Sequence, residues 1–381
     1  MSAWLDRAPC RRQLRGMTDL FSPEALAPAP IETALTIPSA WYTDPRVLAF
    51  ERDAVFARTW QFVGHTSRLD NAGDYLTATV AENPVVVIRD REGALRAFYN
   101  VCRHRGGPLA TDGHGCARML QCQYHGWTYR LDGSLRGVPR FGHSELFDKR
   151  DFGLVPVEVD VAMGLVFVRL ESGGPVLGEA LDGIEDCIAP MDLASLRFHT
   201  RVEYRVACDW KVYVDNYLEG YHLPLVHPEL CDVLDAAAYR TETFPHYNLQ
   251  HSPLREGDAN VYGSSEDAAF YYWLFPTTML NILPGRLQTN TVLPDGSGRC
   301  RVLFDYHYDD LEAGRVADDL AFSDRVQAED IAICEHVQRG LASRGYDRGR
   351  FSPAQEVGVH HFQEMLKGCY REALAGVVAE G

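Results

Sequence analysis

The sequence predicts an α+β protein with two domains, each built on an antiparallel sheet. Short strand-like runs separated by turn residues fill the range 75–170, a Gly/Pro junction follows at residues 173–175, and strand patterns then recur between helical segments. A chain of 381 residues with 46% hydrophobic and 24% charged residues is long enough for about two globular domains. We expect an N-terminal arm over residues 1–43, a first domain over 44–171 and a second over 172–381.

The first domain is expected to open with a helix and to continue as a small antiparallel β structure. Apolar residues at helical spacing over residues 44–60 favour the helix. The tetrad Asp90 to Gly93 is typical of a hairpin turn. Apolar runs bounded by turn residues predict strands at residues 75–80, 84–88, 95–101, 119–123, 127–130 and 165–170. Residues up to about Pro30 contain Ala-Pro repeats and are expected to form a loose arm.

The second domain is expected to be a sheet flanked by helices. Helical patterns occur over residues 177–189 and 323–340. Strand patterns recur at residues 197–206, 271–275, 278–283, 287–293 and 300–308. Residues 231–267 lack a clear periodicity and contain several turn formers, so we expect them to form a loop region that covers a pocket.

Bulk composition excludes several classes of function. A net charge of −16 argues against nucleic acid as a partner, because duplex binding depends on basic contacts to phosphate. The chain has no apolar run of roughly 18 residues, and its weakly basic first residues lack the apolar core of a secretory signal, so we expect a cytoplasmic protein without membrane spans. The ten cysteines are scattered in a chain too long to need disulfides.

Two cysteine–histidine pairs form the strongest local signal. Cys102 and His104 are followed, after seventeen intervening residues, by Cys122 and His125. Glycines follow both pairs, which places the pairs on turns. Such a set can hold a structural zinc ion, but zinc fingers usually pair thiolate with thiolate and imidazole with imidazole. Mixed pairs suit a [2Fe–2S] cluster of Rieske type, with the two thiolates on one iron and the two imidazoles on the other.

The segment from Asp209 to Leu230 predicts one side of a second metal site. Its first part is expected to be helical, and His222 and His227 would point roughly 140° apart if the helix continued straight. We expect Pro224 to end the helix and to push Leu223 toward extended geometry, so that the two imidazoles converge. The alternative is a helix end with two incidental histidines.

A third metal ligand is expected on the helix over residues 323–340. Asp330 lies on the apolar face of this helix, where a lone carboxylate carries a desolvation cost unless it is paired or binds a cation. Glu329 and Glu335 fall toward the polar side and are expected to be solvated. His222, His227 and Asp330 together match a facial triad that leaves positions open on Fe(II). The alternative for Asp330 is a capped or salt-bridged core aspartate.

Three stretches carry a family resemblance. CRHRGGPL and CQYHGWTYRLDGSL resemble the Rieske domain of the large (alpha) subunits of Rieske non-haem iron oxygenases, and NYLEGYHLPLVH resembles their iron-binding segment. The similarity spans roughly Asp44 to the end of the chain. The resemblance implies a helix-grip (START-like) fold, with a curved antiparallel sheet wrapped around a long C-terminal helix. It also implies a Rieske [2Fe–2S] cluster, mononuclear Fe(II) and activation of O₂.

The same resemblance assigns a role to Glu219. This residue matches the family's bridging acid, which hydrogen-bonds a Rieske histidine of the neighbouring subunit and an iron-ligand histidine of its own. It implies an oligomer, expected to be a homotrimer. Asp215 and Asn216 either support the site or, for Asp215, lie at the surface. Because no flavin or dinucleotide fingerprint occurs, electrons are expected from a separate NAD(P)H-dependent reductase, with or without a ferredoxin.

The expected reaction is hydroxylation or demethylation of a small substrate. Residues 329–341 and 271–276 are similar to the choline, glycine betaine and carnitine monooxygenase branch of the family. A quaternary ammonium substrate would suit an aromatic cage, for which Tyr272, Trp273 and Phe275 are candidates. One alternative is an aromatic-ring hydroxylase or dioxygenase, or an O-demethylase. Another is an electron carrier or ligand-binding protein without catalytic iron.

Overall fold

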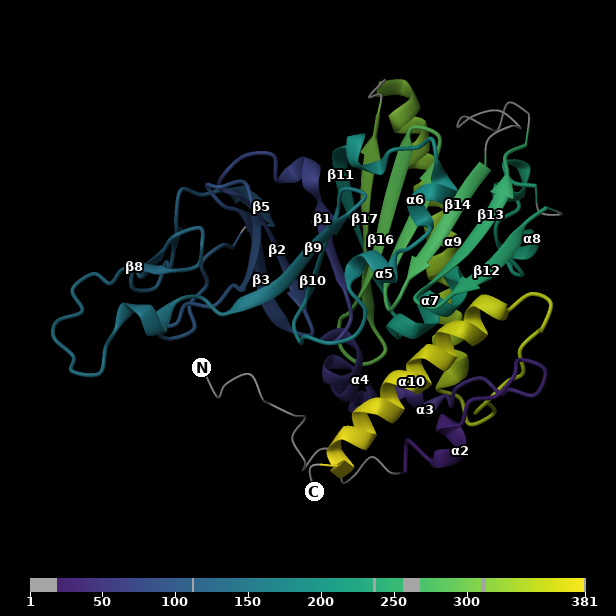
Figure 1. Ribbon diagram of the computed structural model, residues 1–381. Coiled ribbons are helices and arrows are strands. Elements are labelled where there is room, and N and C mark those ends of the chain that lie inside the picture. Colours follow the sequence, from purple (N-terminus) through teal and green to yellow (C-terminus); the bar gives the residue numbers. More distant parts are fainter. Residues whose placement is uncertain (1–18, 112, 236–237, 256–267, 310–312, 380–381) are drawn as a thin grey trace. The chain divides into compact units, whose positions relative to one another are not determined.

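The chain folds into two compact units. The computed structural model describes residues 19–111, 113–235, 238–255, 268–309 and 313–379 (Figure 1). The β unit contains residues 56–185 and 192–198, and the helix–sheet unit contains the described residues up to Val55, residues 186–191 and those from His199 onward. Residues 44–55, which we predicted to open the first domain, therefore pack within the helix–sheet unit.

The β unit is built on a seven-stranded antiparallel sheet and a small three-stranded one. The large sheet has the order β1-β10-β9-β4-β3-β2-β5, and the small sheet has the order β6-β7-β8. Its strands are β1 (Gln61–His65), β2 (Asp74–Val80), β3 (Asn83–Arg89), β4 (Leu95–Tyr99), β5 (His114–Cys116), β6 (Leu120–Gln121), β7 (Thr128–Tyr129), β8 (Leu135–Gly137), β9 (Pro156–Ala162) and β10 (Leu165–Arg169). The six strands predicted here are confirmed, and β1, β5, β8 and β9 were missed.

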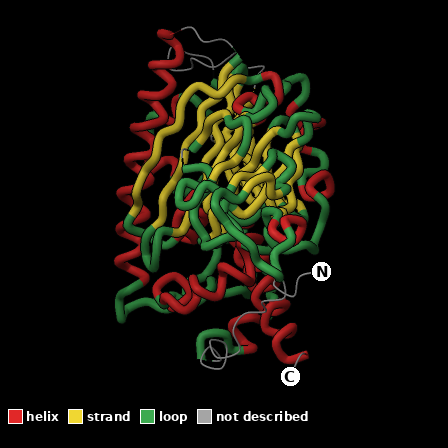
Figure 2. Tube along the Cα trace, turned by 90° about the vertical axis from the view of Figure 1, so that its left-hand side faces the viewer, coloured by secondary structure: helices red, strands yellow, loops and turns green. Residues whose placement is uncertain are grey.

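The helix–sheet unit is a single antiparallel sheet of seven strands with helices. The order is β11-β17-β16-β15-β14-β13-β12. The strands are β11 (Arg197–Val206), β12 (Arg240–Phe244), β13 (Tyr247–Pro253), β14 (Ala268–Leu274), β15 (Thr278–Leu283), β16 (Arg286–Pro294) and β17 (Cys300–Tyr308). The long helix α9 (Ala313–Leu341) runs along the curved sheet (Figure 2), as the helix-grip prediction requires.

The remaining helices lie near the chain ends and around the sheet. They are α2 (Pro23–Leu26), α3 (Ala40–Thr43), α4 (Pro45–Glu51) with a π-helical turn at Arg52–Phe56, α5 (Leu177–Ala180), α6 (Ile184–Ile188), α7 (Trp210–Tyr217), α8 (Leu223–Val226) and α10 (Val357–Ala379). The helix predicted over residues 177–189 is thus split in two. Among the described residues, no helix has the length and hydropathy that a membrane span requires.

The prediction of a loop over residues 231–267 was wrong for its middle part. β12 and β13 pair there in an antiparallel register that joins Phe244 to Tyr247. On β13, Tyr247, Asn248, Leu249 and Gln250 are all buried. A strand covered on both faces has no alternating polar pattern, which is why sequence periodicity missed it. Residues 256–267 lie outside the described part of the chain.

The segment before β1 is packed rather than loose. Trp41 is fully buried, and its ring lies 5.3 Å from that of Phe21 and 5.0 Å from that of Tyr370 on α10, measured between centroids. The expectation of a loose arm is therefore wrong from Phe21 onward, because apolar side chains before and after the Ala-Pro repeats reach the core. Residues 1–18 lie outside the described residues.

A buried charge cluster joins α4 to the start of α7. The Lys211 ammonium lies 2.8 Å from a carboxylate oxygen of Glu51 and 2.8 Å from one of Asp209, and the side chains of Lys211 and Glu51 are fully buried. Burial lowers the pKa of Lys211, but the two carboxylates raise it by a larger amount, so the pKa is raised overall. Asp209 also caps α7, because its carboxylate accepts a hydrogen bond from Lys211 N.

Replacing this buried cation is expected to destabilise the helix–sheet unit. Lys211→Met leaves Glu51 and Asp209 buried beside each other without a positive charge, which typically costs about 3–5 kcal/mol. Urea unfolding followed by circular dichroism measures the loss. The matched control is Lys149→Met, because Lys149 is exposed and should change the free energy of unfolding by less than about 0.5 kcal/mol. Equal free energies of unfolding for the two variants would contradict the stabilising role of Lys211 between Glu51 and Asp209.

Candidate metal centres

Local geometry around α7 and α8 brings the two histidines together, but not as predicted. α7 ends at Tyr217, and α8 begins at Leu223 with Pro224 in its first turn. Proline is tolerated there because the first helical N–H groups have no intrahelical partner. The chain therefore bends at residues 218–221, and the expectation of an extended Leu223 was wrong. One helical turn then separates the histidines, since His227 N donates to Leu223 O at 2.9 Å.

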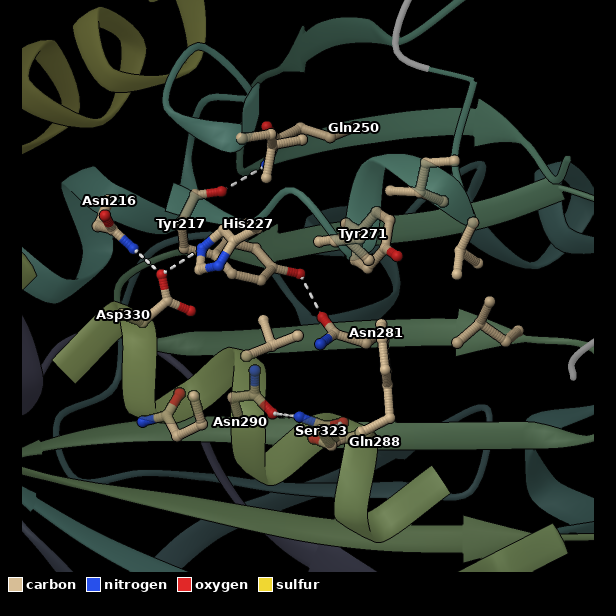
Figure 3. A pocket seen from close by; sticks show the side chains of 18 of the residues that line it. Asn216, Tyr217, His227, Gln250, Tyr271, Asn281, Gln288, Asn290, Ser323 and Asp330 are labelled. Carbon is tan, nitrogen blue, oxygen red and sulfur yellow. Dashed lines mark hydrogen bonds and ion pairs between the residues drawn. The ribbon is translucent and has the colours of Figure 1, made fainter. Parts of the chain in front are cut away.

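His222, His227 and Asp330 converge on a common point. One ligand atom from each of the three side chains lies within 4.8 Å of the others. His227 Nε2 is 2.9 Å from Asp330 Oδ1, and His222 Nε2 is 3.9 Å from the same oxygen. Asn216 on α7 donates to Asp330 Oδ1 at 2.7 Å, which fixes the carboxylate (Figure 3). Both imidazoles thus present Nε2 to the carboxylate.

Each imidazole also meets a glutamate with its other nitrogen. His222 Nδ1 lies 2.6 Å from Glu219 Oε1, and His227 Nδ1 lies 2.7 Å from Glu329 Oε2. An acceptor at Nδ1 favours the tautomer that leaves Nε2 available for a metal. Glu219 is placed as expected next to His222. The expectation that Glu329 is merely solvated was wrong, because its carboxylate reaches back to His227.

Two further predictions about nearby acids also fail. Asp215 is neither a site residue nor a surface residue. It is half-buried, and its carboxylate accepts hydrogen bonds from Tyr42 at 2.6 Å and Gln363 at 3.2 Å. Burial raises the pKa of Asp215 to about 7. Glu335 accepts a hydrogen bond from Ala207 N at 3.0 Å, so it is not simply solvated.

The donor set fits a divalent transition metal. Two imidazole nitrogens and one carboxylate oxygen are the ligands of the facial-triad geometry. Burial lowers the pKa of His227, but Asp330 and Glu329 raise it by more, so the net pKa is raised. A buried imidazole between two carboxylates favours a positive charge at this position, and a bound metal ion supplies one.

Two loops with the same hydrogen-bond pattern carry the predicted cluster ligands, which are Cys102 and His104 on one loop and Cys122 and His125 on the other. Cys102 N donates to Gly107 O at 2.8 Å, and Gly106 N donates to Cys102 O at 3.0 Å. Cys122 N donates to Trp127 O at 2.8 Å, and Gly126 N donates to Cys122 O at 2.9 Å. Gly106 and Gly126 have φ values of +72° and +74°, which favour glycine.

These loops bring the thiols and imidazoles together. The rings of His104 and His125 lie 4.7 Å apart between centroids, and both Cys102 and Cys122 are buried free thiols. The Nδ1 atom of His104 is buried and has no hydrogen-bond partner in the described structure. A buried imidazole nitrogen without a partner is costly unless it binds something, so the arrangement fits a cluster held by two thiolates and two imidazoles.

The loops leave little space for larger side chains. A Cβ atom at Gly107 would lie 2.8 Å from Cys122 Sγ, so this position requires glycine. Tyr129 on β7 lies 3.3 Å from Cys102 Sγ through its hydroxyl, which also accepts a hydrogen bond from Arg103 N at 2.9 Å. His104 stacks on Trp127 at 4.8 Å. Packing therefore holds both loops in place.

A pocket with a cavity of about 130 Å³ opens beside the histidine–aspartate group. An apolar cavity of about 150 Å³ is sufficient for benzene, so this space suits a small molecule. Its aromatic wall includes Tyr217, Tyr239, Tyr271 and Phe322. A polar wall includes Arg286, Gln288 and Asn290 on β16 and Ser323 on α9, of which Gln288, Asn290 and Ser323 are labelled in Figure 3.

The three predicted pocket residues do not line this pocket. Tyr272 points to the other face of β14 from Tyr271, since neighbouring side chains of a strand alternate. Trp273 is fully buried and packs on Phe362 of α10, with ring centroids 5.2 Å apart. Phe275 lies beyond the end of β14 and contacts Trp273. Of the aromatic residues in the range 271–276, only Tyr271 lines the pocket.

The sequence signals for the missed residues were weak. Tyr239 comes from a segment predicted as a loop, without a motif. Tyr217 lies in the stretch NYLEGYHLPLVH, which indicated a metal site but not a role for this tyrosine in a pocket. Glu329 precedes the predicted ligand Asp330, so adjacency was available as a signal. Its position about 100° around the helix from Asp330 suggested solvent instead.

Two protein-family models match this chain, and each covers one of the two candidate metal centres. Residues 59–149 match the family model described as the Rieske [2Fe-2S] domain. Residues 193–372 match the model described as the ring hydroxylating alpha subunit (catalytic domain). The first range contains both cysteine–histidine loops, and the second contains the histidine–aspartate group and the pocket.

Full-length relatives extend this agreement. Choline monooxygenase of Arabidopsis thaliana is 36% identical over 360 residues, covering 88% of this chain and 83% of the relative. The carnitine monooxygenase oxygenase subunit of Escherichia coli K12 is 32% identical, covering 93% and 98%. A solved quaternary ammonium Rieske monooxygenase has a TM-score of 0.82 at 31% identity, covering 88% and 95%. The chain therefore belongs to the Rieske oxygenases, and it is an oxidoreductase with a Rieske [2Fe–2S] domain and the catalytic domain of the mononuclear-iron members.

Proposed function

We propose that this chain is the oxygenase component of a system that uses O₂ to hydroxylate or demethylate a small quaternary ammonium compound. The observation that carries the proposal is the group of His222, His227 and Asp330 at the end of a small pocket with an aromatic wall. Two monooxygenases of quaternary ammonium compounds are similar over most of the chain. A pure electron carrier would not need this pocket or a second metal group.

We assign the metal ligands residue by residue. His222, His227 and Asp330 would hold mononuclear Fe(II). Cys102, Cys122, His104 and His125 would hold the [2Fe–2S] cluster. When bound, the two groups supply one-electron transfer and activation of O₂. The side chains of this chain orient the ligands, and the pocket walls exclude water and position the substrate.

Electron delivery is proposed to pass through Glu219. Its carboxylate contacts His222 Nδ1 at 2.6 Å, which supports a position between an iron ligand and an external donor. A similar solved structure of a quaternary ammonium Rieske monooxygenase gives insight into inter-subunit electron transfer, which supports transfer between neighbouring subunits here. The proposed assembly is a homotrimer. The electrons are proposed to come from a separate NAD(P)H-dependent reductase, with or without a ferredoxin. The proposed location is the cytoplasm, although the plant relatives are named as chloroplastic.

The substrate cation is proposed to lie against the aromatic wall of the pocket. A quaternary ammonium group is attracted to aromatic faces and cannot donate hydrogen bonds. Tyr239, Tyr271 and Phe322 pack beside the apolar cluster that contains Leu234 and Leu283. Arg286 of the polar wall is paired with Asp319 at 2.7 Å, so its charge is compensated. An aromatic-ring dioxygenase or O-demethylase is the competing assignment.

A single-turnover assay tests the substrate class without knowledge of the reductase. The chemically reduced, iron-loaded enzyme is mixed with O₂ and with choline, glycine betaine, carnitine or an aromatic acid, and products are measured by mass spectrometry. We expect a hydroxylated or demethylated product from at least one quaternary ammonium compound, because the aromatic wall favours a cation. Turnover of aromatic acids alone would contradict the proposal.

Asp330→Ala is expected to remove the mononuclear iron and to preserve the cluster. Iron should fall from about three atoms per chain to about two, with an unchanged visible spectrum, because only the facial triad loses a ligand. Metal analysis and absorbance measure both. Asp324→Ala is the matched control on the same helix, where the exposed carboxylate contacts Tyr204 at 3.0 Å. Full iron content in Asp330→Ala would refute the ligand assignment.

Glu219→Gln is expected to retain both metal centres and to slow electron delivery. Glutamine can still accept a hydrogen bond from His222 but carries no charge. The rate of cluster oxidation in a substrate-bound single turnover, followed by stopped-flow absorbance, should fall at least about tenfold. A variant with full iron content and the wild-type rate would show that Glu219 has no role in the transfer.

A further inference from the structure

The helix α9 places two consecutive carboxylates on the same imidazole. Asp330 Oδ1 lies 2.9 Å from His227 Nε2, and Glu329 Oε2 lies 2.7 Å from His227 Nδ1. Consecutive residues of a helix point about 100° apart, so the two side chains approach the ring from different directions. His227 is 2% exposed, whereas the Glu329 side chain is 42% exposed.

We propose that Glu329 is the positioning residue for the His227 metal ligand, acting through the hydrogen bond to Nδ1. This inference rests on the proposed function, since it requires a metal ion at Nε2. Among the described residues, the Glu329 side chain makes no hydrogen bond or ion pair with His222 or Asp330, and it does not line the pocket. Its role is to fix the tautomer and the plane of the ring and to raise the basicity of Nε2.

The two histidines are therefore held in different ways. Glu219, which holds His222, is three residues away on the same segment and also accepts a hydrogen bond from His222 N at 3.1 Å. Glu329 is 102 residues from His227 and belongs to the helix that supplies Asp330. One rigid helix thus sets the position of its own ligand and the orientation of a ligand from α8. A displacement of α9 would disturb two of the three ligands together.

The neighbouring helix positions provide a matched control. Glu335 is a glutamate on the same helix, but its carboxylate accepts a hydrogen bond from Ala207 N and contacts no metal-site residue in the described structure. Glu329→Ala removes both charge and acceptor, Glu329→Gln keeps an acceptor, and Glu335→Ala changes the same residue type elsewhere. The comparison separates ring positioning from general loss of acidic charge.

The experiment is an anaerobic Fe(II) titration of cluster-loaded protein from which a chelator has removed mononuclear iron. Glu329→Ala should weaken Fe(II) binding by roughly tenfold to a hundredfold, the usual effect of losing such a partner. Glu329→Gln should weaken it less, and Glu335→Ala should match the wild type. The melting temperature of the iron-free protein should be the same in Glu329→Ala and wild type, because the inference concerns metal binding and not folding.

A second measurement observes the ring directly. In the Co(II)-loaded protein, the exchangeable Nδ1–H protons of the two histidines should give paramagnetically shifted NMR signals, and Glu329→Ala should lose one of them to solvent exchange. Wild-type Fe(II) affinity in Glu329→Ala, or an equal loss in Glu335→Ala, would overturn the inference. Failure of the wild type to bind a third iron would instead overturn the proposed function.

Discussion

The structure depends on hydrogen-bond partners for polar and charged side chains that are shielded from water. The imidazoles and carboxylates of the candidate metal site can lose their hydration because each has a defined partner. His227 is nearly inaccessible, yet both of its nitrogens contact a carboxylate oxygen. Asp330 is fixed by Asn216 in addition. This compensation holds the group of three in one arrangement, as the proposed cation site requires.

The sheet and the long helix α9 place this group of three at a pocket. α9 carries Asp330 near one end of the pocket, and Ser323 and Phe322 line it farther along. α7 and α8 bring the histidines from the other side, and β14 to β16 close the wall. The polar groups of β16 are hydrogen-bonded to one another, since Gln288 Nε2 donates to Asn290 Oδ1 at 2.7 Å. A substrate therefore meets a wall whose polar atoms are already oriented.

Much of the fold and of the candidate site was predictable from the sequence. The rest could not be predicted, and the reasons are physical. The strands predicted at residues 278–283 and 300–308 agree with β15 and β17 to the residue, because turns bound clear apolar runs. β13 was missed because burial on both faces removes alternation. The convergence of His222, His227 and Asp330 was predicted from residue type and spacing, and the structure brings the three together. Glu329 and Tyr239 were not, because their roles depend on tertiary contacts that leave no pattern in the local sequence.

The link between Asp215, Tyr42 and Gln363 has a consequence for the whole unit. Tyr42 lies near the start of the described chain and Gln363 near its end, and both donate to the carboxylate of Asp215 on α7. Gln363 also donates to the Tyr42 hydroxyl at 3.0 Å. The helix that leads to His222 is thus hydrogen-bonded to α3 and to α10, which are far apart in the sequence. Catalytic competence in this protein therefore depends on α10, because α7 has all its partners only after that helix has been synthesised and docked.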